Sequence, residues 1–232
     1  MTKQTGGLVV SLDGPASSGK TTAGAAAALR MSYRFFDSGL AYRAMAWLVR
    51  STSVDVSTLA TARMLAEQIQ FEPDSHRHYR RVLVNGNDIS SRLHTAEVDS
   101  VVSGIAQLPA VRGALLPLQR TIAASGSVIV AGRDIGTVVL PNANLKLYLD
   151  VSASERARRR ALERGLRPGG QDAAQIKASL ATRDRDDMTR AVAPLRIPEG
   201  AVIIRSDDLT LAQTTEQIVT AIQLRLRQLR SD

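Results

Sequence analysis

The strongest constraint in the sequence is a glycine-rich run, GPASSGKT, which begins at Gly14 and ends at Thr21. It fits the pattern G-x-x-x-x-G-K-S/T, whose glycines let the backbone curl until successive N–H groups face a phosphate. The apolar run Leu8–Asp13 before it predicts a strand, and the alanine-rich run Thr21–Arg30 after it predicts a helix. Strand, loop and helix in this order are the context that the motif requires. The sequence therefore predicts a site for nucleotide phosphates.

The same run indicates how its residues bind a nucleotide. Lys20 supplies charge to the phosphates, and the Thr21 hydroxyl can reach an accompanying Mg²⁺. The residues expected to bind the phosphates are Gly14, Pro15, Ala16, Ser17, Ser18, Gly19, Lys20, Thr21 and Thr22. The motif alone does not choose between an ATPase, a GTPase and a kinase. The chain contains no Asn/Thr-Lys-x-Asp sequence for reading guanine, however, which argues against a GTPase.

The rest of the chain alternates apolar runs with helical patterns. Near-continuous apolar runs predict further parallel strands, covered on both faces, at Tyr33–Phe36, Ser127–Ala131, Leu145–Val151 and Ala201–Ile204. Apolar residues at helical spacing predict helices at Ser38–Arg50, Ala110–Ala124, Ala153–Arg164 and Leu211–Leu229. This alternation predicts an α/β fold, with a doubly wound parallel sheet of five strands and flanking helices.

Two stretches depart from the alternation. An Asn85-Gly86 pair beside an apolar run is a strong hairpin signal, so Ile69–Ser90 is expected to form a small antiparallel insertion. Ten arginines lie between Arg156 and Arg196, in a stretch that also contains Gly165, Pro168, Gly169 and Gly170. We expect this stretch to be a helical lid. Its residues Arg156, Arg159 and Arg160 form either a solvated basic face or cations that closure brings over a nucleotide.

Composition narrows the function further. The 232 residues carry 30 Lys and Arg against 22 Asp and Glu, which favours anionic partners such as nucleotides or nucleic acid. Aromatic residues make up only 3% of the chain, few for stacking single-stranded nucleic acid. No run is apolar enough to span a membrane and Met1–Gly7 is short and polar, so a soluble cytoplasmic protein is expected, a monomer because no heptad seam is present. Without cysteine, the histidines His76, His78 and His94 do not suggest a zinc site and are expected on the surface.

Four blocks of sequence together resemble the bacterial cytidylate kinases over most of the chain. One is the glycine-rich run, and the others are FDSGLAYR at Phe36–Arg43, GRDIGTVV at Gly132–Val139 and RDRDDMTR at Arg183–Arg190, which leads into Ala193-Pro194-Leu195. The resemblance implies a single domain over 1–232 with three parts. These are a core at about 1–54, 110–153 and 199–232, an acceptor-binding insertion at about 55–109 and a lid at about 154–198.

The resemblance also implies which residues bind CMP. Ser38, Tyr42 and Arg43 would line the acceptor's phosphate and ribose, while Ser103 and Arg112 would contact the cytosine ring. A purely structural role remains an alternative for each residue expected near the base. Tyr42 could pack in the core, Ser103 could be a small helix residue, and Arg112 could form a structural ion pair with Asp134.

Asp134 matches the residue that reads the exocyclic amine of cytosine, and a carboxylate there would repel the O4 of uracil. Arg133 matches an arginine that grips the acceptor phosphate, Arg183 and Asp187 match contacts to the ribose, and Arg190 would clamp the transferring phosphate. The complete implied CMP site is Ser38, Tyr42, Arg43, Ser103, Arg112, Gly132, Arg133, Asp134, Arg183 and Asp187. The residues expected to be catalytic are Lys20, Arg133, Arg183 and Arg190, and Arg159 of the lid is expected to bind ATP.

The chain departs from the family at Ala131, where an aspartate usually precedes the glycine. Such a carboxylate often orients the waters of Mg²⁺, so either Asp13 or Asp134 takes its place or turnover is lower than in relatives. The leading hypothesis is phosphoryl transfer from Mg·ATP to CMP or dCMP. The alternatives are a kinase with shifted specificity, such as UMP, a poorly catalytic nucleotide-binding protein and a nucleic-acid binder. The preference between CMP and dCMP is not readable from the sequence.

Overall fold

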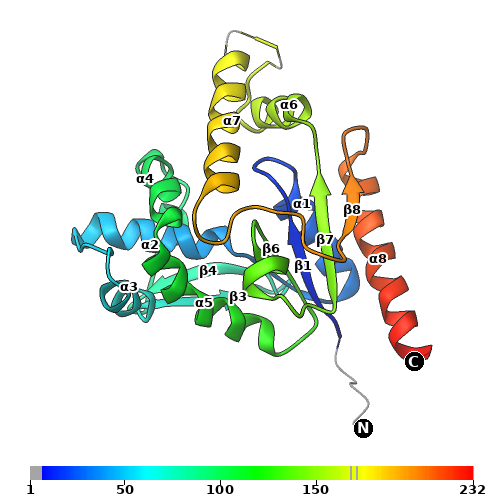
Figure 1. Ribbon diagram of the computed structural model, residues 1–232, viewed down its shortest axis with the longest axis horizontal. Coiled ribbons are helices and arrows are strands. Elements are labelled where there is room, and N and C mark those ends of the chain that lie inside the picture. The colour runs from blue at the N-terminus through cyan, green and yellow to red at the C-terminus, as the bar shows by residue number, and fades with distance from the viewer. Residues whose placement is uncertain (1–6, 168, 171, 232) are drawn as a thin grey trace.

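A computed structural model describes residues 7–167, 169–170 and 172–231 (Figure 1). Its centre is a parallel sheet of five strands in the order β2-β6-β1-β7-β8. The strands are β1 (Val9–Asp13), β2 (Arg34–Asp37), β6 (Val128–Gly132), β7 (Leu145–Asp150) and β8 (Val202–Arg205). Each lies within two residues of the predicted bounds. The prediction of a doubly wound five-stranded sheet is therefore confirmed.

Helices cover both faces of this sheet (Figure 1). They are α1 (Lys20–Met31), α2 (Gly39–Thr52), α3 (Leu59–Ala66), α4 (Ala96–Gln107), α5 (Pro109–Ala124), α6 (Ala153–Glu163), α7 (Ala173–Thr189) and α8 (Leu211–Ser231). Successive residues of β6 point to opposite sides: Val128 and Val130 pack in the core with α2 and α5, whereas Ile129 and Ala131 pack in the core with α1 and α8. This double burial explains why the strand reads as a continuous apolar run.

The expected antiparallel insertion is present. It is a three-stranded sheet of β3 (Ile69–Pro73), β4 (Tyr79–Val84) and β5 (Asn87–Asp88), with neighbouring strands antiparallel. Asn85 and Gly86 form the turn between β4 and β5 with φ of 49° and 79°. Both values lie in the left-handed region that this kind of hairpin turn requires, so the hairpin prediction is confirmed.

The expectation that all three histidines lie on the surface is wrong for His78. His78 is buried, its ring packs edge-on against Phe35 with 5.7 Å between centroids, and its backbone forms an isolated bridge to β2. The turn between β3 and β4 folds back onto the main sheet and carries His78 with it. Charged neighbours along the chain, such as Arg77 and Arg80, gave no sign of that tertiary contact.

The arginine-rich stretch forms a helical hairpin of α6 and α7 above the carboxyl ends of the strands (Figure 1). Ala161, Ile176 and Leu180 of this hairpin share a small apolar cluster with Ala16 of the glycine-rich loop. The hairpin therefore packs directly on that loop. Pro168, which the sequence places between its helices, lies outside the described residues.

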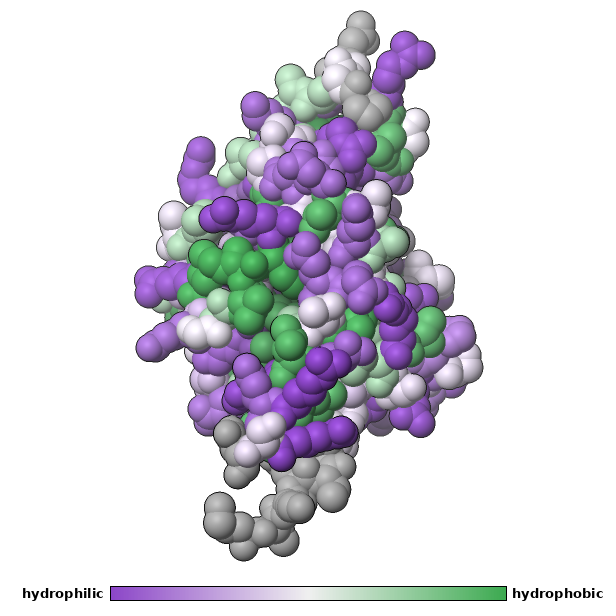
Figure 2. Space-filling model, turned by 90° about the vertical axis from the view of Figure 1, so that its right-hand side faces the viewer, coloured by the Kyte–Doolittle hydropathy of each residue, from purple (hydrophilic) through white to green (hydrophobic). Residues whose placement is uncertain are grey.

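The edge of the sheet formed by β8 exposes apolar side chains to solvent. Strand β8 is an edge strand, and Val202, Ile203 and Leu224 expose apolar surface beside it and α8 (Figure 2). Among the described residues, no single helix is long and apolar enough to cross a membrane, although the bent pair α4 and α5 meets the length and composition criteria when taken together.

Candidate active site

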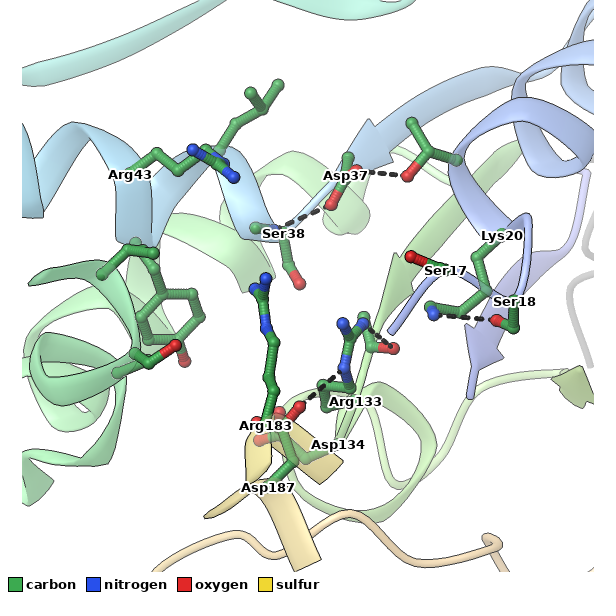
Figure 3. Close-up of a pocket in the computed structure, with 18 of the residues that line it drawn as sticks. Ser17, Ser18, Lys20, Asp37, Ser38, Arg43, Arg133, Asp134, Arg183 and Asp187 are labelled. Atoms are coloured by element: carbon green, nitrogen blue, oxygen red, sulfur yellow. Dashed lines mark hydrogen bonds and ion pairs between the residues drawn. The ribbon is translucent and has the colours of Figure 1, made fainter. Parts of the chain in front are cut away.

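A cavity of about 310 Å³ opens at the carboxyl ends of the parallel strands. Doubly wound sheets bind their ligands at this edge, where loops and helix starts from several strands converge. The glycine-rich loop forms one end, α4 and α5 form the other, and the ends of β2 and β6 with the lid helices line the space between. Figure 3 shows Arg183 reaching from α7 toward Ser38, with Arg133 and Lys20 facing the same space.

Most of the residues predicted from the sequence line this one cavity. They are Ser17, Ser18, Gly19, Lys20, Thr21, Thr22, Ser38, Tyr42, Arg43, Ser103, Arg112, Gly132, Arg133, Asp134, Arg183, Asp187 and Arg190. Four predicted residues do not line it, namely Gly14, Pro15, Ala16 and Arg159. Residues separated by more than a hundred positions thus meet in one space.

The glycine-rich loop owes its path to its two glycines. Gly14 has a φ of 153°, and a Cβ there would lie 2.5 Å from the Leu149 carbonyl oxygen. Gly19 caps α1 with a φ of 91°, in the left-handed region. Lys20 begins that helix, and its buried Nζ donates to the Pro15 carbonyl at 2.6 Å and to Ser18 Oγ at 3.1 Å. Burial, followed by the charge of Arg133, holds the pKa of Lys20 well below its ordinary value.

A hydroxyl and a carboxylate meet at the mouth of the loop. Thr21 Oγ1 donates to Asp37 Oδ2 at 2.5 Å, and Asp37 lies beside Ala131 in the register of β2 and β6. Hydroxyl and carboxylate oxygens are the donors that Mg²⁺ prefers, so this pair fits the metal that accompanies a nucleotide. The carboxylate of Asp37, on the adjacent strand, therefore lies next to the position where Ala131 replaces the usual aspartate.

The sequence offers Asp13, Asp134 or a lower turnover as consequences of the missing carboxylate, and neither of these two side chains is hydrogen-bonded to Thr21 among the described residues. Asp13 is buried and accepts hydrogen bonds from the backbone N–H groups of Ile135 and Gly136. Asp134 is paired with Arg112. Asp37, which accepts from Thr21 and from the Gly39 N–H, is the carboxylate that lies next to the Thr21 hydroxyl.

The far end of the cavity is a buried polar cluster. The Asp134 carboxylate pairs with Arg112 through one oxygen and lies 3.4 Å from Arg190 Nη2 through the other. The Arg112 guanidinium lies over the Tyr42 ring, 5.2 Å from its centroid. Burial raises the pKa of Tyr42, so its phenol stays protonated at neutral pH. Arg112 and Asp134 therefore form the structural pair considered above, and the same pair lines the cavity.

The lining of the cavity as a whole carries an excess of positive charge. Seven cationic side chains line the cavity against four carboxylates. Arg133 and Arg190 both bond to Asp187, at 2.9 Å and 3.2 Å. Arg183 has no ion pair among the described residues, and burial followed by the charge of Arg133 lowers its pKa. A buried guanidinium without an ion pair is stabilised strongly when an anionic ligand binds beside it.

Two of the three lid arginines, Arg156 and Arg159, bond to the glycine-rich loop. Arg156 is buried, donates to the Ala16 carbonyl at 3.2 Å and pairs with Asp184 at 2.6 Å. Arg159 donates to the Ser18 carbonyl at 3.1 Å and also bonds to Ser206. The reading of these two as a solvated basic face is therefore wrong: they fasten the lid to the glycine-rich loop.

Arg160, the third lid arginine, lines the cavity and pairs with Glu163 at 3.1 Å. Glu163, Asp37 and His94 also line the cavity, although none of them was predicted as a site residue. Asp37 could have been found from its place at the end of a predicted strand. His94 and Glu163 gave no comparable signal, because their positions depend on how α4 and the lid pack.

The chain is similar to known proteins over most of its length. The family model described as cytidylate kinase matches residues 10–224. The cytidylate kinase of Pseudomonas fluorescens (strain SBW25) is 37% identical over 219 residues, which cover 94% of this chain and 96% of that protein. The bifunctional pantoate ligase/cytidylate kinase of Synechococcus elongatus is 38% identical over 216 residues, 91% of this chain, and the chain spans only 41% of its length.

Among solved structures, a shikimate kinase from Bacteroides thetaiotaomicron aligns over 95% of this chain and 98% of its own, at 14% identity and a TM-score of 0.45. A likeness this low adds nothing to the assignment. The assignment rests on the family model and on the Pseudomonas relative, which match nearly end to end. With both in agreement, the chain belongs to the cytidylate kinase family.

Proposed function

We propose that the protein transfers the γ-phosphoryl group of ATP to CMP or dCMP, yielding ADP and CDP or dCDP. One observation carries this proposal. A single cavity has a phosphate-binding loop at one end, a buried carboxylate, guanidinium and phenol cluster at the other, and surplus cations between them. A site of this form holds two nucleotides with their phosphates facing each other.

The glycine-rich loop is the donor end. Its backbone N–H groups and the start of α1 would cradle the β-phosphate, and Lys20 would leave the Pro15 carbonyl for the phosphates. Mg²⁺ bound with ATP would neutralise charge between the β- and γ-phosphates, with Thr21 and Asp37 as its protein donors. Arg159 would support this end through its bond to the Ser18 carbonyl.

The buried cluster is the acceptor end. An Asp134 oxygen would accept from the exocyclic amine of cytosine, whereas the same oxygen would repel the O4 of uracil. Arg112 and Ser103 would contact the remaining polar edge of the ring. Ser38 and Arg43 line the path toward the donor end and would hold the CMP phosphate.

Charge neutralisation is the main chemical contribution of the protein. The acceptor phosphate is already ionised at neutral pH, so the attacking oxygen needs no general base. Arg133, Arg183 and Arg190 would stabilise charge on the transferring phosphoryl group together with Lys20. The lowered pKa values of Lys20, Arg183 and Arg190 support this role, because burial disfavours each charged group and an anionic ligand would stabilise it.

The remaining features fit the same activity. We assign acceptor binding to the insertion at about 55–109 and closure to the lid at about 154–198, with the remainder as the core. A monomer is sufficient, because every residue named above comes from one chain. We also propose a cytoplasmic location, where ATP and CMP would be available, and the low aromatic content gives no support to nucleic acid as a partner.

The direct test is ADP release from Mg·ATP with CMP, dCMP, UMP, AMP and GMP as acceptors. Turnover with CMP or dCMP that is lost in Lys20→Ala and less selective in Asp134→Ala is the expected result. Preferred turnover of UMP would replace the acceptor assignment and keep the reaction class. ATP binding without turnover of any acceptor would overturn the proposal.

A further inference from the structure

Asp13 carries a buried carboxylate that lies outside the cavity. Asp13 is the last residue of β1 and immediately precedes Gly14, the first residue of the phosphate-binding loop. Its side chain has no exposed surface and does not line the cavity. No ion pair involves it among the described residues, and the nearby Lys20 ammonium bonds to Pro15 and Ser18 instead. A buried carboxylate without an ion pair is costly, so its contacts need an explanation.

Both oxygens of Asp13 are used on one short turn. Oδ1 accepts from the Ile135 N–H at 2.8 Å, and Oδ2 accepts from the Gly136 N–H at 2.7 Å. These two residues directly follow Asp134, whose carbonyl in turn accepts from the N–H groups of Val138 and Val139. Asp13 therefore holds the backbone that carries the proposed cytosine-reading carboxylate.

A neutral side chain of the same size cannot make this pair of bonds. An asparagine has one oxygen acceptor, and its NH₂ group would face the second backbone N–H as a donor. Burial raises the pKa of Asp13 to about 6, with the two backbone bonds and Lys20 acting in the opposite direction and Asp134 adding to the rise. The carboxylate is thus ionised at neutral pH and able to accept both bonds.

The turn that contains Gly136 also packs closely against β1. A Cβ added to Gly136 would lie 2.6 Å from Ser11 Oγ, 2.8 Å from Pro198 Cγ and 3.1 Å from Asp13 Oδ2. Ser11 lies two residues before Asp13 on the same strand, and its buried hydroxyl has no hydrogen-bond partner among the described residues. The contact at Ser11 is therefore steric, whereas the contact at Asp13 is a directed pair of hydrogen bonds.

We propose that Asp13 is a positioning residue that fixes Asp134 relative to the phosphate-binding loop, and so sets acceptor affinity and base selectivity without touching either nucleotide. This inference rests on the proposed function. The same strand end that continues into the donor loop holds the acceptor-reading turn through two hydrogen bonds. One side chain thereby sets the registration between the two ends of the cavity.

The test is steady-state kinetics of Asp13→Asn with each nucleotide varied in turn. Loss of one bond to a charged acceptor predicts a rise in the KM for CMP of about tenfold and a similar fall in the preference for CMP over UMP, with the KM for ATP changed less than about twofold. Ser11→Ala is the matched control, because it alters the same strand and the same turn contact but removes no hydrogen bond. It is expected to leave both KM values and the selectivity unchanged.

Two results would overturn the inference while the wild type remains active. One is an Asp13→Asn protein whose CMP KM and selectivity equal those of Ser11→Ala. The other is a parallel rise in both KM values, which a general loss of structure would cause. If Asp13→Asn does not fold, Gly136→Ala displaces the same turn with the carboxylate intact, and an unchanged CMP KM there contradicts the inference. A wild-type protein that does not phosphorylate CMP would contradict the proposed function instead.

Discussion

The two ends of the cavity are built in different ways. The donor end is one contiguous run, Gly14–Thr21, whose shape follows from its glycines and the start of α1. The acceptor end is assembled from α2, α5, the turn after β6 and the end of α7, which contribute Tyr42, Arg112, Asp134 and Arg190. A contiguous site is fixed by local backbone geometry, whereas an assembled site depends on every element that carries one of its residues.

The largest effect is expected at the donor end. Lys20→Ala should lower kcat by about 10² to 10³, because it removes a charge that we propose acts on the transferring phosphoryl group. CMP and UMP turnover should fall by the same factor, since Lys20 belongs to the glycine-rich loop and not to the cluster around Asp134. Coupled ADP-release kinetics would measure both. Lys177→Ala, which removes an exposed lysine from α7, is the control. Unequal losses for the two acceptors would contradict the separation of the two ends.

A selective effect is expected at the acceptor end. Asp134→Asn should reduce the kcat/KM preference for CMP over UMP by about 10², since an amide accommodates either exocyclic group. The variant also leaves Arg112 buried without its ion pair and Arg190 paired with Asp187 alone, so a lower melting temperature should accompany the change. Unchanged selectivity in a folded Asp134→Asn protein would remove Asp134 as the cytosine reader.

Asp13 links the two ends, and its ionisation predicts a pH effect on stability. Its pKa is raised in the folded state to about 6 from 3.8, so the folded protein binds more protons than the unfolded chain between these values. Stability relative to Asp13→Asn should therefore fall as pH rises from about 4 to about 6, by at most about 3 kcal/mol, and stay level above that window. Urea unfolding of both proteins across this range measures the difference. A stability difference that grows with pH would contradict a raised pKa.

The smallest effect concerns the metal. Asp37→Asn should raise the Mg²⁺ concentration for half-maximal turnover about tenfold, because the amide is a poorer partner for the metal and its waters. Calorimetric titration of ATP at several Mg²⁺ concentrations gives a readout independent of turnover. Asp55→Asn, on an exposed carboxylate that bonds to Ser57, is the control. An unchanged Mg²⁺ dependence would show that Asp37 does not act for the missing carboxylate at Ala131.

The same contrast explains how far the sequence alone could go. The parallel strands and the glycine-rich loop were predictable, because apolar runs and a local motif encode them directly. The helices α3 and α4 were not predicted, since α3 has only 8 residues and α4 mixes polar and apolar residues in a region dominated by the hairpin signal. The burial of His78 and the docking of Arg156 on Ala16 are tertiary contacts without any local signal.

Within the site, most residues of the family motifs line one cavity, whereas most of their hydrogen-bond and ion-pair partners were not predicted from the sequence. The pairing of Arg112 with Asp134 was one of the alternatives that the sequence offered, whereas the contact of Arg190 with the same carboxylate was not predicted. Asp37 was visible as part of a motif, but its contact with Thr21 depends on how β2 lies beside α1. The motifs thus predict the residue types of the site, whereas most of the contacts that hold these residues in place depend on tertiary packing.

The central claim is that one cavity binds both nucleotides at once, each at its own end. Binding of a bisubstrate molecule that joins adenosine and cytidine through a five-phosphate bridge, measured by calorimetry, tests it most directly. One molecule per chain is expected, bound more tightly than ATP or CMP alone and weakened by both Lys20→Ala and Asp134→Asn. Binding no tighter than that of ATP, or unaffected by Asp134→Asn, would contradict the claim.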